Sequence, residues 1–284
     1  MNYIDISVIS DILKSNTDIG GRTLKELVRV EALNKSFKLS KKQQKLEKTS
    51  ISVRHAVKDL SFSAYEGEIF GLLGPNGAGK TTTLRMLSTL IKPDSGDAFI
   101  DGESIVSAPD KVRAKIGFLT SELKLEEFFT PNFLFDFFSE LHGVDPIVAK
   151  ERKVRLFSKF GIDKFAEVKV ANMSTGMKQK TSLALSIVHD PDIIIFDEPT
   201  NGLDVITAKV VTDFMLDLKK EGKTILLSTH IFTLIEKLCD RVAIIVDGKL
   251  CVCDSLESVC GGKSLEDRFF DIYSEYCERE GKEI

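Results

Sequence analysis

Apolar and charged residues alternate near the amino terminus at 28–32, and a second strand is expected near 55–62. Alternation with a period of two predicts half-buried strands. The run 68–73 is almost wholly apolar and predicts a third strand, buried on both faces. The lysine-rich segment 38–48 between the first two strands predicts a solvated loop. Residues 1–24 form a mixed amphipathic lead-in, for which we expect a helix or a loosely docked extension.

The period of the pattern changes to that of a helix after Gly74. Apolar spacing at 81–91 predicts a helix that the turn residues 93–96 bring to an end. Residues 122–172 again carry helical spacing and predict a helical insertion. Its helix boundaries are expected at Thr130-Pro131, Asp145-Pro146 and Gly161.

Helical and strand patterns alternate from residue 177 onward. The predicted elements are a helix at 177–189, a strand at 192–196, a helix at 205–221, a strand at 224–228, a helix at 231–239 and a strand at 241–246. Such alternation predicts right-handed crossovers on a parallel sheet, and therefore the α/β class. Asp247-Gly248 then predicts a hairpin turn, and the charged tail from Ser264 predicts a helix.

The composition is that of a soluble globular chain, with 43% hydrophobic and 29% charged residues. The net charge is −4, so we expect no nucleic-acid partner. The longest apolar runs, such as 193–196, are far shorter than the ~18 residues of a membrane-spanning helix. No basic-then-apolar leader is visible, so secretion is not expected. The five cysteines, an odd number, favour free thiols in a reducing compartment.

The segment 74–81 matches the pattern G-x-x-x-x-G-K-[ST] between a buried strand and a helix. Glycines let backbone N–H groups wrap a phosphate at a helix N-terminus, whose partial positive charge favours the anion. Lys80 can reach the β- and γ-phosphates, and the Thr81 hydroxyl can coordinate Mg²⁺. This spacing disfavours the alternative, a glycine-rich turn without chemical use. The predicted ATP-binding residues are Gly74, Pro75, Asn76, Gly77, Ala78, Gly79, Lys80, Thr81 and Thr82.

The apolar run 193–196 ends in two acidic residues, Asp197 and Glu198. A buried parallel strand delivers both carboxylates to the carboxyl edge of the sheet, where phosphates bind in open α/β folds. Asp197 would hold Mg²⁺ through water. Glu198 points the other way and is placed to take a proton from an attacking water as a general base. The phosphate loop upstream disfavours the alternative, a strand that ends in a solvated acidic turn.

Three further motifs stand in a fixed order around this acidic pair: Met173-Ser-Thr-Gly-Met-Lys-Gln179, Asn201-Gly-Leu-Asp204 and Ser228-Thr-His230. Together with the phosphate loop they resemble the signature, D-loop and switch histidine of ABC transporter ATP-binding subunits. The resemblance covers about 28–255. It implies a P-loop ATPase core, an antiparallel β subdomain and an inserted helical subdomain. The signature variant and the segment 264–270 are similar to those of single-domain bacterial exporters, including sodium-extrusion (NatA-type) systems.

The resemblance also implies roles for individual residues. Ser174 and Gly176 would cap the γ-phosphate held by a second ATPase subunit, so that each site is shared in a head-to-tail dimer. Asp204 belongs to the D-loop and is expected at the nucleotide. His230 would contact the γ-phosphate and orient the attacking water beside Glu198. Phe37 is the candidate to stack on adenine, with a core phenylalanine as the alternative.

One position departs from the family pattern, because Ser121 stands where the family usually has a glutamine that senses Mg²⁺ and the γ-phosphate. Serine is shorter by a carboxamide arm and would reach the metal only through water or a closer backbone. Glu122 is a possible substitute, although a carboxylate near the γ-phosphate is repelled unless Mg²⁺ intervenes. The role of Ser121 therefore stays open.

Six phenylalanines gather within eleven residues, at 128, 129, 133, 135, 137 and 138. They fall all around a helix, whereas one buried stripe needs fewer. A helix core accounts for about half of them. An exposed aromatic patch would mark a partner surface, and in the family this region receives the membrane subunit.

These observations together predict an ATP-binding and ATP-hydrolysing subunit that powers export of a substrate, such as sodium ions or a drug. Its expected partners are an integral-membrane permease and a second copy of the ATPase, at the cytoplasmic face of a bacterial membrane. The expected division is an extension at 1–27, an ATPase domain at 28–255 and a helical tail at 256–284. Two alternatives stay open: a non-transport ABC-type ATPase, and a regulatory module that binds ATP with little turnover.

Overall fold

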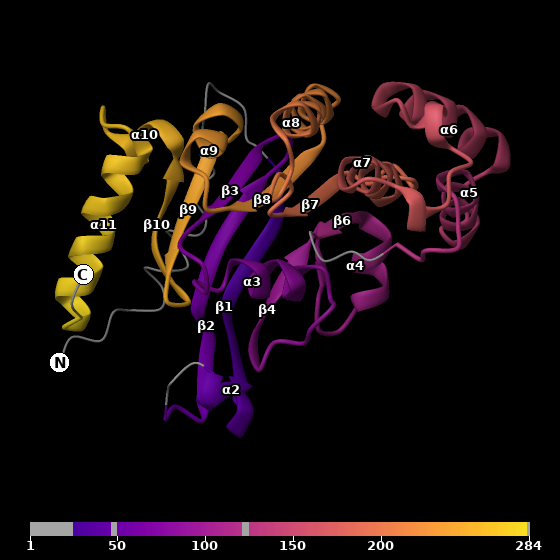
Figure 1. Cartoon of the computed structure of the whole chain (residues 1–284). Coiled ribbons are helices and arrows are strands. Elements are labelled where there is room, and N and C mark those ends of the chain that lie inside the picture. The colour runs from indigo at the N-terminus through magenta and orange to yellow at the C-terminus, as the bar shows by residue number, and fades with distance from the viewer. Residues whose placement is uncertain (1–24, 47–49, 121–124, 283–284) are drawn as a thin grey trace.

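The computed structural model describes residues 25–46, 50–120 and 125–282, which form two β-sheets and the helices around them (Figure 1). The lead-in expected at 1–24 lies outside the described residues. The strand orders of the two sheets are β2-β1-β4-β5 and β10-β9-β3-β8-β7-β6. The predicted α/β class is confirmed.

The smaller sheet is antiparallel and comes from the amino-terminal part of the chain. Its strands are β1 (Glu26–Lys38), β2 (Val53–Tyr65), β4 (Ser95–Ile100) and β5 (Glu103–Ser104). The strands predicted at 28–32 and 55–62 are confirmed, and both extend further than expected. The loop predicted at 38–48 is wrong in part, because Lys41–Leu46 forms the short helix α2. Lysine, glutamine and leucine all favour helix, a preference that the charge pattern alone does not show.

The larger sheet holds the buried parallel strands. They are β3 (Ile69–Leu73), β6 (Ile116–Thr120), β7 (Ile193–Asp197), β8 (Thr224–Thr229) and β9 (Arg241–Val246). The edge strand β10 (Lys249–Ser255) runs antiparallel to β9 across the predicted hairpin turn. The apolar runs predicted as strands from residue 68 onward are therefore confirmed, and β3 lies between β8 and β9 at the centre of the sheet.

Helices connect these strands and cover the sheet. They are α3 (Lys80–Leu87), α4 (Pro109–Lys115), α7 (Thr175–Ser186), α8 (Val205–Lys220), α9 (Phe232–Leu238), α10 (Leu256–Cys260) and α11 (Leu265–Glu280). The helix predicted at 81–91 ends early, since the backbone turns left-handed at Thr89, with φ 61°. Helix α4 was not predicted, because it buries only Val112 and shows no apolar stripe.

The helical insertion contains α5 (Pro131–Leu141), α6 (Pro146–Phe160) and two 3₁₀ turns, η1 (Ile162–Phe165) and η2 (Val170–Asn172). The Thr130 hydroxyl accepts from Phe133 N, and the Asp145 carboxylate accepts from Ile147 N and Val148 N. Gly161 ends α6 in the left-handed conformation. The three predicted helix boundaries are confirmed. The insertion lies at the opposite side of the molecule from α11 (Figure 1).

Each face of the larger sheet carries its own hydrophobic core. On β7, Ile193 and Ile195 face a core shared with the antiparallel sheet and α3. Ile194 and Phe196 face the other core, which includes the helical insertion, α8, α9 and α11. Successive strand residues point to opposite faces, and each fully buried large aliphatic side chain contributes about 1.5–3 kcal/mol. β7 therefore packs against both hydrophobic cores, and its carboxyl end carries the acidic residues of the site.

Arg241, at the start of β9, links the two sheets. Its guanidinium donates to Ser63 O at 2.8 Å and lies over the rings of Tyr65 and Phe70. It also lies 3.3 Å from Glu68 Oε1. Burial raises the pKa of the Glu68 carboxyl to about 7, although Arg241 opposes that shift. This link fixes the antiparallel sheet against β3, the strand that leads into the glycine-rich loop.

Candidate functional site

The glycine-rich loop 74–81 joins β3 to α3, and its path requires glycine at two close approaches to other strands. A Cβ at Gly79 would lie 2.3 Å from Ala56 O, and Gly79 has φ 101°. A Cβ at Gly74 would lie 2.2 Å from Ile245 O. Only glycine fits such contacts and such a left-handed backbone. The loop is thereby packed between β2 and β9 and leads directly into α3. The N-terminus of a helix is a favourable site for a phosphate.

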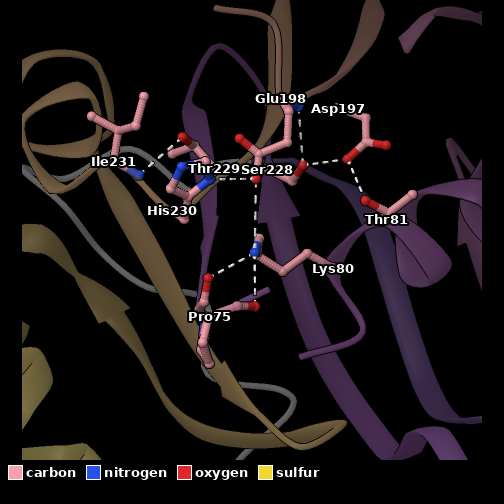
Figure 2. A network of polar contacts seen from close by, with 10 residues as sticks. Pro75, Lys80, Thr81, Asp197, Glu198, Ser228, Thr229, His230 and Ile231 are labelled. Carbon is pink, nitrogen blue, oxygen red and sulfur yellow. Dashed lines mark hydrogen bonds and ion pairs between the residues drawn. The ribbon is translucent and has the colours of Figure 1, made fainter. Parts of the chain in front are cut away.

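Lys80 is the first residue of α3, and its side chain is buried against the loop. Its ammonium donates to Gly74 O at 2.7 Å and to Pro75 O at 3.1 Å (Figure 2). Nζ also lies 3.8 Å from Glu198 Oε1. Burial lowers the pKa of the Lys80 ammonium, while the Glu198 and Asp197 carboxylates oppose that shift. The positive charge is therefore held at the point where the predicted nucleotide phosphates would bind.

Asp197 ends β7 with its side chain buried. Its Oδ1 accepts hydrogen bonds from Thr81 Oγ1 at 2.9 Å and from Ser228 Oγ at 2.5 Å (Figure 2). The structure thus brings two of the three predicted metal-binding side chains, Thr81 and Asp197, into contact. The sequence marks Ser228 only as part of the motif Ser228-Thr-His230. Its contact with Asp197 follows from the sheet, where the two residues pair in register.

Glu198 turns away from Asp197, as predicted. Its backbone N–H donates to Ser228 O at 3.1 Å, and its φ of 50° is unusual for a residue with a side chain. Strain of this kind clusters at functional sites. The Glu198 carboxylate accepts from His230 Nδ1 at 3.1 Å, so this nitrogen carries the proton (Figure 2). The predicted base and the predicted switch histidine are therefore in direct contact.

These side chains surround an open hollow of about 440 Å³, a volume within the usual range of small-molecule sites. Phe37 lines it from β1 with an exposed ring. Sequence reasoning missed three lining residues, Arg54, Ala56 and Asn201. Arg54 pairs with Phe37 in the β1–β2 register, and no pattern in the sequence marks it. The hollow is lined by Phe37, Arg54, Ala56, Asn76, Gly77, Ala78, Gly79, Lys80, Thr81, Thr82, Glu198, Asn201 and His230.

Three predicted nucleotide-binding residues, Ser174, Gly176 and Asp204, do not line this hollow. The Ser174 hydroxyl caps α7 by accepting from Met177 N. A Cβ at Gly176 would lie 3.0 Å from Thr207 Oγ1. Asp204 caps α8, accepting from the backbone of Ile206 and Thr207, and the Thr207 backbone N–H is the main cause that lowers the Asp204 pKa. Gly176 and Asp204 therefore lie side by side outside the hollow, as a role in a second subunit's site would require.

Ser121, the predicted metal contact in place of glutamine, lies outside the described residues. The strand that leads to it is described. β6 ends at Thr120, which pairs in register with Asp197. The chain therefore leaves β6 beside the predicted metal-binding carboxylate.

The phenylalanine cluster lines a second hollow, of about 340 Å³, between the helical insertion and the sheet. Phe135 is buried, whereas Phe128, Phe129, Phe133 and Phe137 are exposed. Phe129, Phe133 and Phe137 form a stacked row, with ring centroids 4.4 and 6.2 Å apart. We call this hollow the aromatic groove. The cluster is thus more than a helix core.

Two histidines form one wall of the aromatic groove. His142 and His189 stack face to face with ring centroids 4.0 Å apart. His189 Nε2 donates to Ile116 O at 3.0 Å, and its buried Nδ1 has no partner among the described residues. Burial lowers the pKa of His189 to about 4, and His142 adds to that shift. Burial also lowers the pKa of His142, so both environments favour the neutral ring on this side of the groove.

Comparisons with known proteins agree with this geometry. The family model described as ABC transporter matches residues 57–201. The ABC transporter ATP-binding protein NatA of Bacillus subtilis (strain 168) is 39% identical over 213 residues, which cover 75% of this chain and 87% of that protein.

A second relative and a solved structure are also similar to this chain. The Nod factor export ATP-binding protein I of Burkholderia orbicola (strain AU 1054) is 39% identical over 193 residues, which cover 68% of this chain and 64% of that protein. A solved structure of an ATP-binding subunit of an ABC transporter superimposes with a TM-score of 0.76 at 26% identity. It covers 87% of this chain and 99% of the solved chain.

Proposed function

This chain belongs to the family of ABC transporter ATP-binding proteins, and we propose that it powers export of a substrate through a separate integral-membrane permease. As a family member it binds ATP and is an ATPase. One observation carries the proposal: Lys80, Glu198 and His230 line a single hollow at the end of the parallel sheet. Asp197 lies buried behind it, in contact with Thr81, which also lines the hollow. A regulatory module without turnover would not need the contact between Glu198 and His230.

In this proposal, the side chains that line the hollow have roles in hydrolysis. The Lys80 ammonium balances the charge of the β- and γ-phosphates, while the N–H groups of the glycine-rich loop hold them in place. Glu198 accepts a proton from the attacking water. His230 holds the Glu198 carboxylate through Nδ1 and orients the water at the γ-phosphate. Phe37 stacks on the adenine ring from β1.

The residues around Asp197 fit a magnesium ion. The Thr81 hydroxyl and the Asp197 carboxylate lie 2.9 Å apart and offer the oxygen ligands that Mg²⁺ prefers. Mg²⁺ in nucleotide sites keeps several waters and binds substrate phosphates, so it needs no dense cluster of acidic side chains. The described part of the chain contains no such cluster. When bound by Thr81 and Asp197, Mg²⁺ would neutralise the negative charge that develops on the phosphates. Ser121 is its third proposed contact, through water.

A second copy of the chain completes each site in this proposal. Ser174 and Gly176 lie outside the hollow that holds Lys80, beside Asp204. In a head-to-tail dimer they reach the γ-phosphate on the partner copy, and Asp204 supports them at the interface. Gln179 Nε2 donates to Pro199 O at 3.1 Å, which connects the signature helix to the segment that follows Glu198.

The permease docks at the aromatic groove. The stacked row of phenylalanines is exposed, and burial favours the neutral form of the histidines beside it, so an apolar helix of the permease can bury its side chains here. The groove adjoins β6, which pairs with the Asp197 strand. Binding at the groove is therefore one strand away from the proposed metal site.

Replacing Phe133 or Phe137 by serine is expected to weaken association with the permease and to leave ATP binding unchanged. Both side chains are about half exposed, at 47% and 49%, so their loss should cost less than about 1 kcal/mol of folding stability. Co-purification yield and melting temperature are measured on the same samples.

Two control variants accompany this experiment. Phe270→Ser removes a phenylalanine of similar exposure, 55%, from α11 and should co-purify normally. Phe135→Ser removes a buried ring and should cost about 3–5 kcal/mol. If every melting-neutral Phe→Ser variant in the groove still co-purifies at full yield, docking takes place elsewhere.

The location, domain division and substrate complete the proposal. Among the described residues, no helix combines the length and the apolar character needed to cross a bilayer. We place the chain peripherally at the cytoplasmic face of a bacterial membrane, with an extension at 1–27, the ATPase domain at 28–255 and a helical tail at 256–284. Sodium ions or a drug are the proposed substrates, and the export direction has support from a relative named for Nod factor export.

The experiment that tests the export function is co-purification of the membrane partner, followed by ATPase measurements across candidate ions and drugs. We expect the permease to change the ATPase rate and one substrate class to stimulate it further. ATP hydrolysis that no membrane protein alters would contradict the proposal and favour a non-transport ATPase.

A further inference from the structure

The carboxyl-terminal helix α11 is tied to the turn between β9 and β10. Tyr276 Oη donates to Asp247 Oδ2 at 3.4 Å, and Lys282 Nζ contacts the same carboxylate oxygen. A second ion pair, Lys249 Nζ to Glu280 Oε1 at 2.7 Å, holds β10 against the end of the helix. Figure 1 shows α11 running along the β10 edge of the sheet. The tail therefore holds the side chain of the first turn residue.

The second turn residue touches the glycine-rich loop. Gly248 N donates to Ala78 O at 2.9 Å, and Gly248 O accepts from Lys58 N at 2.8 Å. A Cβ at Gly248 would lie 2.7 Å from Ala56 O, the same carbonyl that Gly79 approaches. Asp247 and Gly248 have φ of 50° and 82°, as in the two-residue turns that favour Asp-Gly and Asn-Gly. The turn is thus packed between the loop and β2.

The hydrogen bond from Gly248 fixes the orientation of one peptide group in the loop. The peptide between Ala78 and Gly79 is planar and trans, so its C=O and its N–H point in opposite directions. Because Gly248 holds the Ala78 carbonyl on its own side, the Gly79 N–H is aimed the other way. Ala78 and Gly79 both line the hollow. A backbone N–H group that points into the hollow can donate to a phosphate oxygen.

We propose that Asp247, Tyr276 and Lys282 are positioning residues for the nucleotide: the tail holds the turn, and the turn orients the Gly79 N–H for phosphate. This inference rests on the proposed function of the hollow as the ATP site. The Gly79 N–H would contact the phosphates equally in the ground state and in the transition state. Loss of such uniform binding raises KM without changing kcat.

The test uses Asp247→Asn, Lys282→Met and the double variant in the full-length chain. Asparagine suits the same turn, so the variant removes the carboxylate charge and keeps the backbone. Both partners are partly exposed, and pairs of this kind are worth at most about 1 kcal/mol. We therefore expect ATP to bind about two- to fivefold more weakly, with an equal rise in KM and an unchanged kcat.

Three controls test whether the loss of ATP affinity depends on the turn Asp247-Gly248. The double variant should bind ATP no more weakly than either single variant, since both remove the same contact. Tyr276→Phe, which removes only the hydroxyl donor, should weaken ATP binding in the same direction. Lys263→Met, which breaks an ion pair with Asp271 at the other end of α11, should bind ATP normally.

Several outcomes would overturn the inference. These are wild-type ATP affinity in Asp247→Asn and Lys282→Met, additive losses in the double variant, a matching loss in Lys263→Met, or a fall in kcat at unchanged KM. In each of these cases the unmodified chain still binds ATP. Failure of the unmodified chain to bind ATP would instead overturn the function proposed for the hollow, and this inference with it.

Discussion

The variant Glu198→Gln is expected to bind ATP normally and to hydrolyse it about 10²–10⁴-fold more slowly. Glutamine keeps the size of the side chain and can still hydrogen-bond, but it cannot accept a proton at neutral pH. Glu198 lies 3.1 Å from His230 Nδ1 at the open side of the hollow. Asp197, by contrast, is buried under two hydroxyl donors. Only one of the two carboxylates is therefore free to act on a water.

The measurement compares ATP affinity with the rate of phosphate release in the same preparation. Glu221→Gln is a matched control, because Glu221 lies at the exposed end of α8 and away from the hollow. It should hydrolyse ATP at the normal rate. A Glu198→Gln protein that keeps nearly normal turnover would show that another group removes the proton.

Mixing Lys80→Ala chains with Gly176→Asp chains should restore hydrolysis that neither variant shows alone. Lys80 lies in the hollow, whereas Gly176 lies at the start of α7 beside Thr207. In a mixed dimer, one site combines an intact Lys80 with an intact signature from the other chain. Random pairing of equal amounts gives one such site in half of the dimers, so about a quarter of the wild-type activity is expected.

This prediction needs proof that mixed dimers form. Two different affinity tags, used in sequence, isolate dimers that contain one chain of each kind. These should retain about half of the wild-type activity per dimer, since one of two equivalent sites is intact. Inactive mixed dimers of confirmed composition would mean that Gly176 acts within its own chain, and the shared site would be wrong.

The chemistry of the site could be read from the sequence where a motif is local. Loop 74–81 lies between a buried strand and a helix as predicted, and the end of the 193–196 run delivers Asp197 and Glu198 to the edge of the sheet. Both predictions depend on residues that are consecutive in the chain. Local propensity and burial are sufficient for them.

The remaining features depend on which strands become neighbours. Ser228 reaches Asp197 because β7 and β8 pair in a particular register, and Gly248 reaches Ala78 because β9 lies beside β3. No spacing in the sequence encodes either contact. Asp204 caps α8 within one copy of the chain, and its place at the nucleotide of a second copy stays a prediction.

The central position of β3 also determines when this protein can fold during its synthesis. Ile69 pairs with Ile225 of β8, and Phe70 pairs with Arg241 of β9. About 150 further residues must therefore leave the ribosome before the strand behind the glycine-rich loop gains its first neighbour, β8. At 5–20 residues per second this takes roughly 8–30 s. Throughout that interval β3 presents an apolar strand with two unpaired edges, the kind of segment that nascent-chain chaperones shield from aggregation.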